Sequence, residues 1–274
     1  MNKLILLLFT ILCYSLSAQN QAEIIGESWE ISNGTLQLGK KQSDSLAIKY
    51  WNYLNNLLPS KLLKRYVTRL ILFTDGAEEV LGEIAPLNNI NTKWSVAIDT
   101  IDFKFEIKDS TYIQDYTHTL IHEFGHLLTL NPEQVEITDD DYQDDEKGYL
   151  TSEGYAKKNS YLGEFVSTFW NADFLKEWDK IDNIKNENRK VRRLQRFYFH
   201  NKNQFLSDYA SESPEEDIAE SWTFFVLSDK PSKFGKIKLK KILFFYKFPE
   251  LIQLRSEIRS KISLIPIDYV NNYK

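Results

Sequence analysis

The residues best suited to chemistry lie in one short stretch of the chain, His122-Glu123-Phe124-Gly125-His126. Two histidines four positions apart lie one turn apart on the same face of an α-helix, so both imidazoles can bind a single zinc ion. Glu123 stands beside the first histidine, where it suits a general base acting on water rather than a metal ligand. The alternative is a helix that carries these side chains without a metal. Three of the four histidines fall within nine residues, which favours the metal site and leaves His118 an outer or structural role.

A catalytic zinc site needs a third protein ligand and an open coordination position. A third histidine at the spacing of one known motif is excluded, because Thr129 and Pro132 occupy the places of that motif's glycine and histidine. A carboxylate must therefore complete the site. Glu146 lies among aspartates shortly before a glycine, which is poor helix material, and Glu164 has no acidic residue one turn later.

A second segment, which begins at Ser213, offers a better carboxylate. Ser213 and Pro214 are a favourable N-cap and first residue of a helix. Glu216 and Glu220 then lie one turn apart on one face, and the small Ala219 allows close approach to another helix. In this interpretation Glu216 binds the metal, and Glu220 orients one of the ligands by hydrogen bonding. The alternative is that Glu216 forms a capping box with Ser213 and serves only the helix end.

A larger framework must position these residues, and the pattern of apolar residues outlines it. We predict an α+β fold: a small mixed β-sheet with one helix, the metal helix laid against the sheet, and a mostly helical lobe after it. The predicted strands cover 28–31, 66–73, 93–99 and 103–107, and the predicted helices cover 43–58, 115–130, 161–178 and 189–197.

The first eighteen residues are typical of a secretory signal peptide. Lys3 precedes a short apolar run, and small residues lead up to Ala18, where we expect cleavage. The run is too short for a membrane-spanning helix, which needs about 20 apolar residues. We therefore expect a secreted or periplasmic protein without a membrane span.

The remaining chain, 19–274, is expected to fold as one domain, with a sheet lobe over 19–130 that includes the metal helix and a helical lobe over 131–274. Cys13 is the only cysteine and lies in the signal peptide, so the mature core does not depend on disulfides. The formal charge of −5 argues against general nucleic-acid binding.

Two charged segments have open interpretations. The acidic loop 139–146 resembles half of a calcium-binding loop but has Asp144 where such loops have glycine, so a solvated loop is the favoured alternative. The basic helix 189–197 alternates arginines with apolar residues. It could contact anionic lipid, but a solvated helix face is the favoured interpretation.

The His-Glu-Phe-Gly-His block, taken with the stretch from Asp208 to Glu220, resembles the gluzincin zinc metallopeptidases. The nearest resemblance is to anthrax lethal factor-like catalytic domains, pro-pro endopeptidases and secreted zinc-binding metallopeptidases of bacteria. It covers roughly 115–130 and 205–260, and in it 241–251 corresponds to the closing helix of the family. The 90 residues between His126 and Glu216 are about double the gap in lethal factor-like domains, which affects the shape of the cleft and the choice of substrate.

The resemblance implies a zincin-like fold and a zinc-dependent metallopeptidase with a peptide or protein substrate. Zn²⁺ would be held by His122, His126 and Glu216, with Glu123 as general base. Tyr209, seven residues before Glu216, would stabilise the oxyanion. Independently of the resemblance, we expect the strand at 93–98 to be an edge strand that pairs with an extended substrate. Two alternatives stay open: a catalytically silent zincin-fold protein that binds peptides, and a zinc hydrolase of a non-peptide amide.

Overall fold

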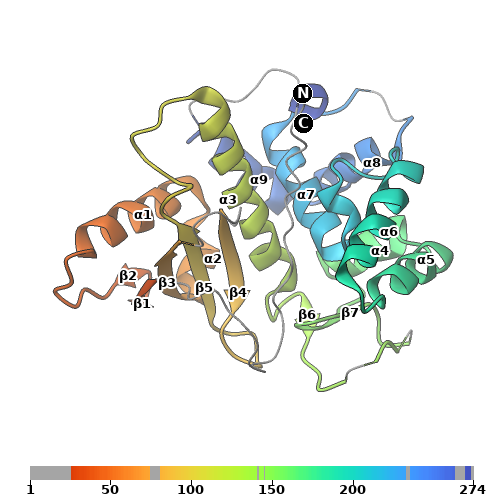
Figure 1. The fold of residues 1–274 in the computed structure, drawn as a ribbon, viewed down its shortest axis with the longest axis horizontal. Helices are drawn as coiled ribbons and strands as arrows, with labels where there is room; N and C mark the ends of the chain where they lie inside the picture. The colour runs from red at the N-terminus through yellow and green to blue at the C-terminus, as the bar shows by residue number, and fades with distance from the viewer. Residues whose placement is uncertain are drawn as a thin grey trace. The chain divides into compact units, whose positions relative to one another are not determined.

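The computed structural model describes residues 26–74, 81–140, 142–144, 146–232, 235–262 and 269–272. The expected signal peptide lies outside these residues, as does part of the acidic loop. The chain forms two compact units that meet between Leu120 and Ile121, inside the long helix α3 (Ser110–Leu130; Figure 1). None of the described helices is long and apolar enough to cross a membrane.

The described strands of the first unit form a five-stranded mixed sheet, in the order β2-β1-β3-β5-β4. β3 and β5 are parallel, and the other pairs are antiparallel. β1 and β2 form a hairpin at Asn33 and Gly34, whose positive φ angles of 50° and 76° suit the tight turn expected of this pair. The strands are β1 (Glu27–Ser32), β2 (Thr35–Leu36), β3 (Val67–Phe73), β4 (Gly82–Pro86) and β5 (Trp94–Asp99).

Two helices precede β3. The first, α1 (Asp44–Leu57), confirms the predicted helix at 43–58 and buries Tyr50, Trp51 and Leu54 on its apolar stripe. Pro59 separates it from α2 (Ser60–Tyr66), a helix that the pattern of the sequence did not predict. The start of α3 belongs to the same unit, where the ring of Tyr116 contacts the ring of Tyr53 on α1 at 5.8 Å between centroids.

The predicted strand at 103–107 is wrong. These residues form turns, with the rings of Phe103 and Phe105 packed 5.2 and 4.8 Å from that of Tyr50. The hydroxyl of Tyr112 on α3 donates to Asp102 O and accepts from Lys104 N at 2.6 Å. The Tyr112 hydroxyl thus takes the place of a neighbouring strand as hydrogen-bond partner for two backbone groups. The alternation of Phe103 and Phe105 reflects packing on α1 rather than a strand.

The prediction that 93–98 forms an edge strand is also wrong. β5 lies between β3 and β4 and pairs with both, so its backbone has no free edge for an extended peptide. The edge strands of the described sheet are β2 and β4, and the sequence pattern did not predict β4. Its Gly82 and Pro86 are poor strand formers, but an edge strand tolerates a proline that cannot donate a ladder hydrogen bond.

The second unit is mainly helical, which confirms the predicted helical region. After the end of α3 come a small sheet, in the order β6-β8-β7, and a series of helices around α7. Every residue of α7 except Glu215 is buried. The elements are β6 (Val135–Glu136), β7 (Leu150–Thr151), β8 (Gly154–Ala156), α4 (Tyr161–Phe169), α5 (Ala172–Asp182), α6 (Glu187–His200), η1 (Tyr209–Ser211), α7 (Pro214–Leu227), α8 (Ile237–Phe244), η2 (Phe245–Lys247), α9 (Pro249–Arg259) and α10 (Tyr269–Asn272).

Two predicted boundaries in this unit are wrong. The single helix expected over 161–178 is two helices, because Asn171 starts α5 by accepting a hydrogen bond from Phe174 N at 3.1 Å. Asparagine competes well as an N-cap, so the aromatic stripe runs on while the backbone changes direction. The segment 241–251 is likewise divided among α8, η2 and α9, with Pro249 as the first residue of α9.

Candidate metal centre

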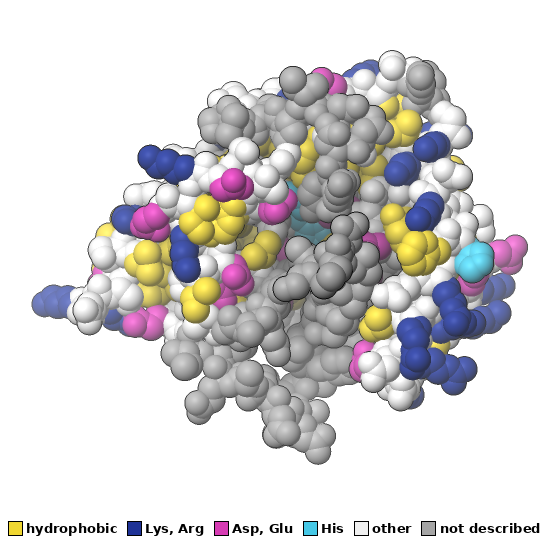
Figure 2. Space-filling view, turned by 45° about the horizontal axis from the view of Figure 1, so that its top comes forward, with side chains coloured by type: hydrophobic (Ala, Val, Ile, Leu, Met, Phe, Trp, Pro, Cys, Tyr) yellow, Lys and Arg dark blue, Asp and Glu magenta, His cyan; other side chains and the backbone are white. Residues whose placement is uncertain are grey.

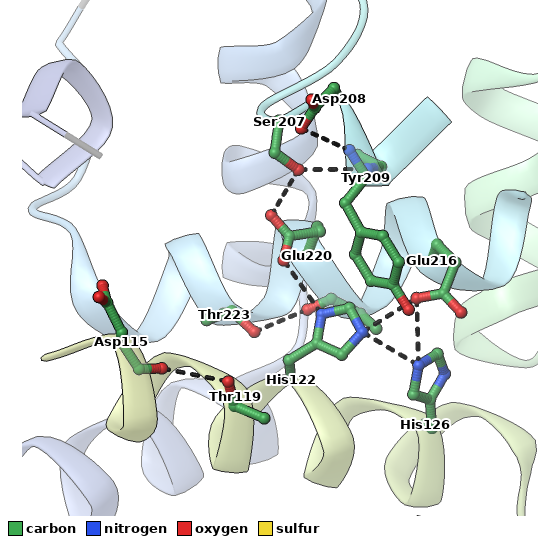
Figure 3. Close-up of polar contacts among 12 residues, drawn as sticks. Asp115, Thr119, His122, His126, Ser207, Asp208, Tyr209, Glu216, Glu220 and Thr223 are labelled. Atoms are coloured by element: carbon green, nitrogen blue, oxygen red, sulfur yellow. Dashed lines mark hydrogen bonds and ion pairs between the residues drawn. The ribbon is translucent and has the colours of Figure 1, made fainter. Parts of the chain in front are cut away.

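The end of α3 brings the two histidines of the His-Glu-x-x-His stretch together. Their Nε2 atoms lie 3.1 Å apart, and their rings meet edge to face. Asn131 ends the helix, where its side chain donates to the carbonyls of Leu127 and Leu128. Both imidazoles therefore point one nitrogen to the same place, as the helical spacing requires (Figure 3).

The start of α7 brings a carboxylate to that place. Ser213 caps the helix by accepting a hydrogen bond from Glu216 N at 3.1 Å. The Glu216 side chain does not return to the cap. Its Oε2 lies 3.0 Å from His122 Nε2 and 3.3 Å from His126 Nε2. Ser213 thus serves the helix end, while the carboxylate of Glu216 completes a group of three atoms (Figure 3).

Close approach of α7 to the end of α3 depends on small residues. A Cβ atom at Gly125 would lie 3.1 Å from Ala219 Cα and 3.1 Å from Trp222 Cδ1, which is tighter than ordinary packing. Gly125 faces α7 one residue before His126, and Ala219 lies between Glu216 and Glu220 in the sequence. The absence of a side chain here lets two helix backbones approach, and this approach sets the distance between the histidines and the carboxylate.

A second carboxylate on α7 orients His122. Its Nδ1 lies 3.1 Å from Glu220 Oε1, and the other oxygen of Glu220 accepts a hydrogen bond from Ser207 Oγ at 2.7 Å. Ser207 also accepts from Ala210 N at 3.2 Å. Because the Glu220 carboxylate accepts, Nδ1 of His122 carries a proton, and Nε2 is the ring atom that can bind a metal ion. This is the tautomer of a metal ligand with a hydrogen-bonded outer partner.

The three inner atoms can hold a metal ion: His122 Nε2, His126 Nε2 and Glu216 Oε2. They are separated by 3.0–3.3 Å, and two ligands at about 2.0–2.1 Å from a tetrahedral ion lie about 3.3–3.4 Å apart. All three are electron-pair donors when His126 is also neutral, so they would repel one another around an empty centre. A cation relieves that repulsion, and the residues present fit one.

The pKa shifts of the three inner residues also indicate that this site favours a positive charge. Burial alone would lower the pKa of His122, but hydrogen bonds and negative charge from Glu216 and Glu220 outweigh it and raise the pKa to about 10. Burial also opposes protonation of His126, and Glu216 again raises its pKa. The pKa of Glu216 is raised by burial and lowered more strongly by the two histidines, so the net shift is downward. Without metal, protons supply the positive charge that this point demands.

The group opens to solvent on the side of His126. The His126 side chain is 13% exposed, whereas those of His122 and Glu216 are 4% and 3% exposed. Glu123 is buried, and its negative charge acts on both His126 and Tyr209.

Tyr209 lies over the centre, in the short helix η1. Its ring centroid is 5.2 Å from that of His122, and its hydroxyl points toward the Glu216 carboxylate (Figure 3). Burial and the charge of Glu216 raise its pKa well above the usual value, so the phenol keeps its proton. A protonated hydroxyl beside the inner atoms can donate a hydrogen bond to a bound group.

The other acidic candidates lie elsewhere. Glu215 accepts a hydrogen bond from Tyr149 at 3.0 Å, and Glu164 faces Lys247 at 3.4 Å. Glu146 is exposed in the acidic loop, where Asp140 of the same loop pairs with Lys147 at 2.6 Å. His118 is buried on α3, one turn before His122.

The sequence pattern did not predict two residues that are important to the geometry of the metal centre. Ser207 has no periodic relation to Glu220, since its loop and α7 meet only through the fold. Gly125 stands inside the motif itself, and a glycine in the middle of a predicted helix is a usable signal of close packing. The chain gives no match to models of known protein families, to curated proteins or to solved structures.

Proposed function

We propose that the protein is a zinc-dependent metallopeptidase that acts outside the cytoplasm. The supporting observation is the meeting of His122, His126 and Glu216 on two close helices, with Glu220 behind His122. Zinc bound there would polarise a substrate carbonyl and lower the pKa of a water molecule. Export is supported by the signal-peptide pattern of residues 1–18.

Glu123 is proposed as the general base. It is buried beside the metal ligands, yet the helix directs it away from the point where the three inner atoms meet, since adjacent helical residues differ by about 100°. A carboxylate in this place can accept a proton from water and return it to the leaving amine. His122, His126 and Glu216 would be occupied in binding the metal during the reaction, so we assign both proton transfers to Glu123.

Tyr209 is proposed as the donor to the oxyanion. Its hydroxyl stays protonated and lies on the same side of His122 as the Glu216 carboxylate (Figure 3). A donor that is already placed where negative charge develops needs no reorganisation during the reaction. We infer zinc as the metal from the two-imidazole, one-carboxylate donor set, which is typical of catalytic zinc.

The test is cleavage of a mixed peptide library by the purified protein, followed by mass spectrometry, with chelator and with zinc restored. Cleavage that needs metal is expected. Glu123→Gln should keep the zinc content and lower kcat by about 10²–10⁴-fold, because the ligands stay while the proton acceptor is lost. Binding of peptides without cleavage by the zinc-loaded protein would instead support a silent peptide-binding protein, and cleavage of cell-wall amides alone would support the non-peptide hydrolase.

A further inference from the structure

A basic stripe on α6 is separate from the metal centre. Between residues 185 and 202 the chain has one acidic residue and seven basic ones, a net charge of +6, whereas the whole chain carries −5 and the rest therefore −11. The basic residues are Lys185, Arg189, Lys190, Arg192, Arg193, Arg196 and Lys202. This is a local reversal of charge on an acidic protein.

Four arginines form the centre of the stripe. Arg189, Arg192, Arg193 and Arg196 are spaced by three and four positions, so they lie on one face of α6 over about 10 Å. All four side chains are exposed, and in the described part of the chain none of them forms an ion pair with an acidic side chain. Lys190, at the margin of the stripe, pairs with Asp182 at 2.7 Å.

A neighbouring face of α6, about 90° around the helix from the middle of the arginine stripe, is fixed inside its unit. Phe197 is buried, with its ring 4.9 Å from that of Phe174 and 5.7 Å from that of Phe205. This packing directs the arginine face outward. Figure 2 shows Lys and Arg side chains gathered beside an exposed histidine on this part of the surface. The packing of α6 thus keeps the arginine side chains facing solvent.

An exposed aromatic residue continues the stripe. Phe199 lies one turn after Arg196 on the same face and is 60% exposed, and the Lys202 ammonium lies 4.4 Å from its ring centroid. An aromatic ring beside cations is suited to the boundary between lipid head groups and acyl chains. The ammonium already covers a face of the ring, which disfavours stacking of a nucleic-acid base there.

We propose that the α6 stripe docks the protein on an anionic phospholipid surface. Guanidinium groups bind phosphate bidentately, and each Lys or Arg near such a surface adds to the affinity over a range of about 10 Å. Phe199 enters the head-group layer, while the apolar face of α6 remains packed in the protein. The metal centre takes no part, so this proposal stands or falls independently of the peptidase.

The experiment is sedimentation of the full chain with vesicles of phosphatidylcholine, with and without about one third phosphatidylglycerol. Binding to the anionic vesicles alone, weakened at high salt, is expected. Replacing the four arginines by glutamine should lower the partition coefficient by about 10²–10³-fold. The matched control is Lys49→Gln, Lys61→Gln, Lys64→Gln and Lys93→Gln, which removes equal charge from exposed sites in the first unit and should leave binding within about threefold.

A second variant, Phe199→Ser, should weaken binding several-fold and leave its salt dependence unchanged. Circular dichroism and zinc content report whether each variant is folded. The proposal is overturned by equal binding to neutral vesicles, by an arginine variant that binds like its control, or by tighter binding to a duplex oligonucleotide than to the anionic vesicles.

Discussion

Two neighbouring residues of α7, Glu216 and Asp217, enter two buried polar groups of opposite character. Asp217 forms an ion pair with Lys241 of α8 and accepts from Trp170 Nε1 at 2.8 Å, and both charged side chains are fully buried. Glu216 faces His122 and His126, neither of which carries a permanent positive charge. The first group contains its own cation, and the second does not.

A structural polar group contains both of its charges, whereas a cation-binding site contains only the negative one. The Asp217–Lys241 pair supplies both of its own charges, and aromatic rings surround the ammonium, with Phe205 4.7 Å from it. The histidine group needs a positive charge from outside, either protons or a metal ion. Both groups stabilise the packing of α7, but only the second can change its occupancy.

The largest effect is expected from Glu216→Ala. Loss of one of three ligands should lower zinc affinity by more than the roughly 10–100-fold that follows loss of an outer partner, and should abolish turnover. The matched control is Glu215→Ala, because Glu215 bonds to Tyr149 rather than to the histidines. Metal analysis after dialysis separates the two variants. Equal zinc in both would remove Glu216 from the ligand set.

The placement of Glu216 could be predicted because neighbouring residues determine where α7 begins and therefore which of its side chains share a face. Ser213 and Pro214 set the first turn, and helical geometry then determines which carboxylates share a face. The pairing of His122 with His126 follows in the same way from spacing alone. Asp217, one position after Glu216, therefore points away from the two histidines and accepts a hydrogen bond from Trp170.

Features that depend on contacts between elements could not be predicted in this way. β5 is central because β3 pairs with one of its edges and β4, a strand that the sequence pattern did not predict, pairs with the other. The turns around Phe103 exist because Tyr112 supplies the backbone's partners. The Asp217–Lys241 pair joins residues 24 apart, and neither residue carries a local signal of burial. The spacing of apolar residues shows which face of a helix or strand is buried, but it does not show which other element covers that face.

The second largest effect is expected from a change in the Asp217–Lys241 pair. Lys241→Met leaves Asp217 buried without its cation, which should cost about 3–5 kcal/mol in the free energy of unfolding. The matched control is Lys247→Met, whose partner Glu164 is exposed, with an expected cost below about 1 kcal/mol. Urea unfolding in chelator and in zinc should give the same difference between the two variants. A difference that disappears in chelator would mean that the two groups are coupled.

Tyr209→Phe tests the aromatic residue above the histidine group. Removal of its hydroxyl should lower kcat by about 10²–10³-fold and leave the zinc content unchanged, as for loss of one oxyanion donor. The control is Tyr161→Phe, because the Tyr161 hydroxyl bonds to Glu250 of α9. If kcat is the same in both variants, Tyr209 is a packing residue.

The smallest effect is expected from Ser207→Ala, which acts on the histidine group through Glu220. The Ser207 hydroxyl donates to the same carboxylate that accepts from His122 Nδ1, so its loss removes one of the hydrogen bonds that hold Glu220. We expect zinc affinity to fall by about tenfold, the lower limit for an outer partner, because the bond from His122 remains.

Ser211→Ala is the matched control for this change. Ser211 lies in the same short segment, but its hydroxyl donates to Asp208 O at 2.6 Å rather than to Glu220. Competition of each variant with a chelator gives the zinc affinity directly, and Ser207→Thr, which keeps a hydroxyl, should restore it. If Ser207→Ala and Ser211→Ala weaken zinc binding equally, the hydroxyl stabilises the loop that carries Tyr209 rather than the orientation of His122. A loss confined to Ser207→Ala would extend the metal centre by one residue beyond the carboxylates.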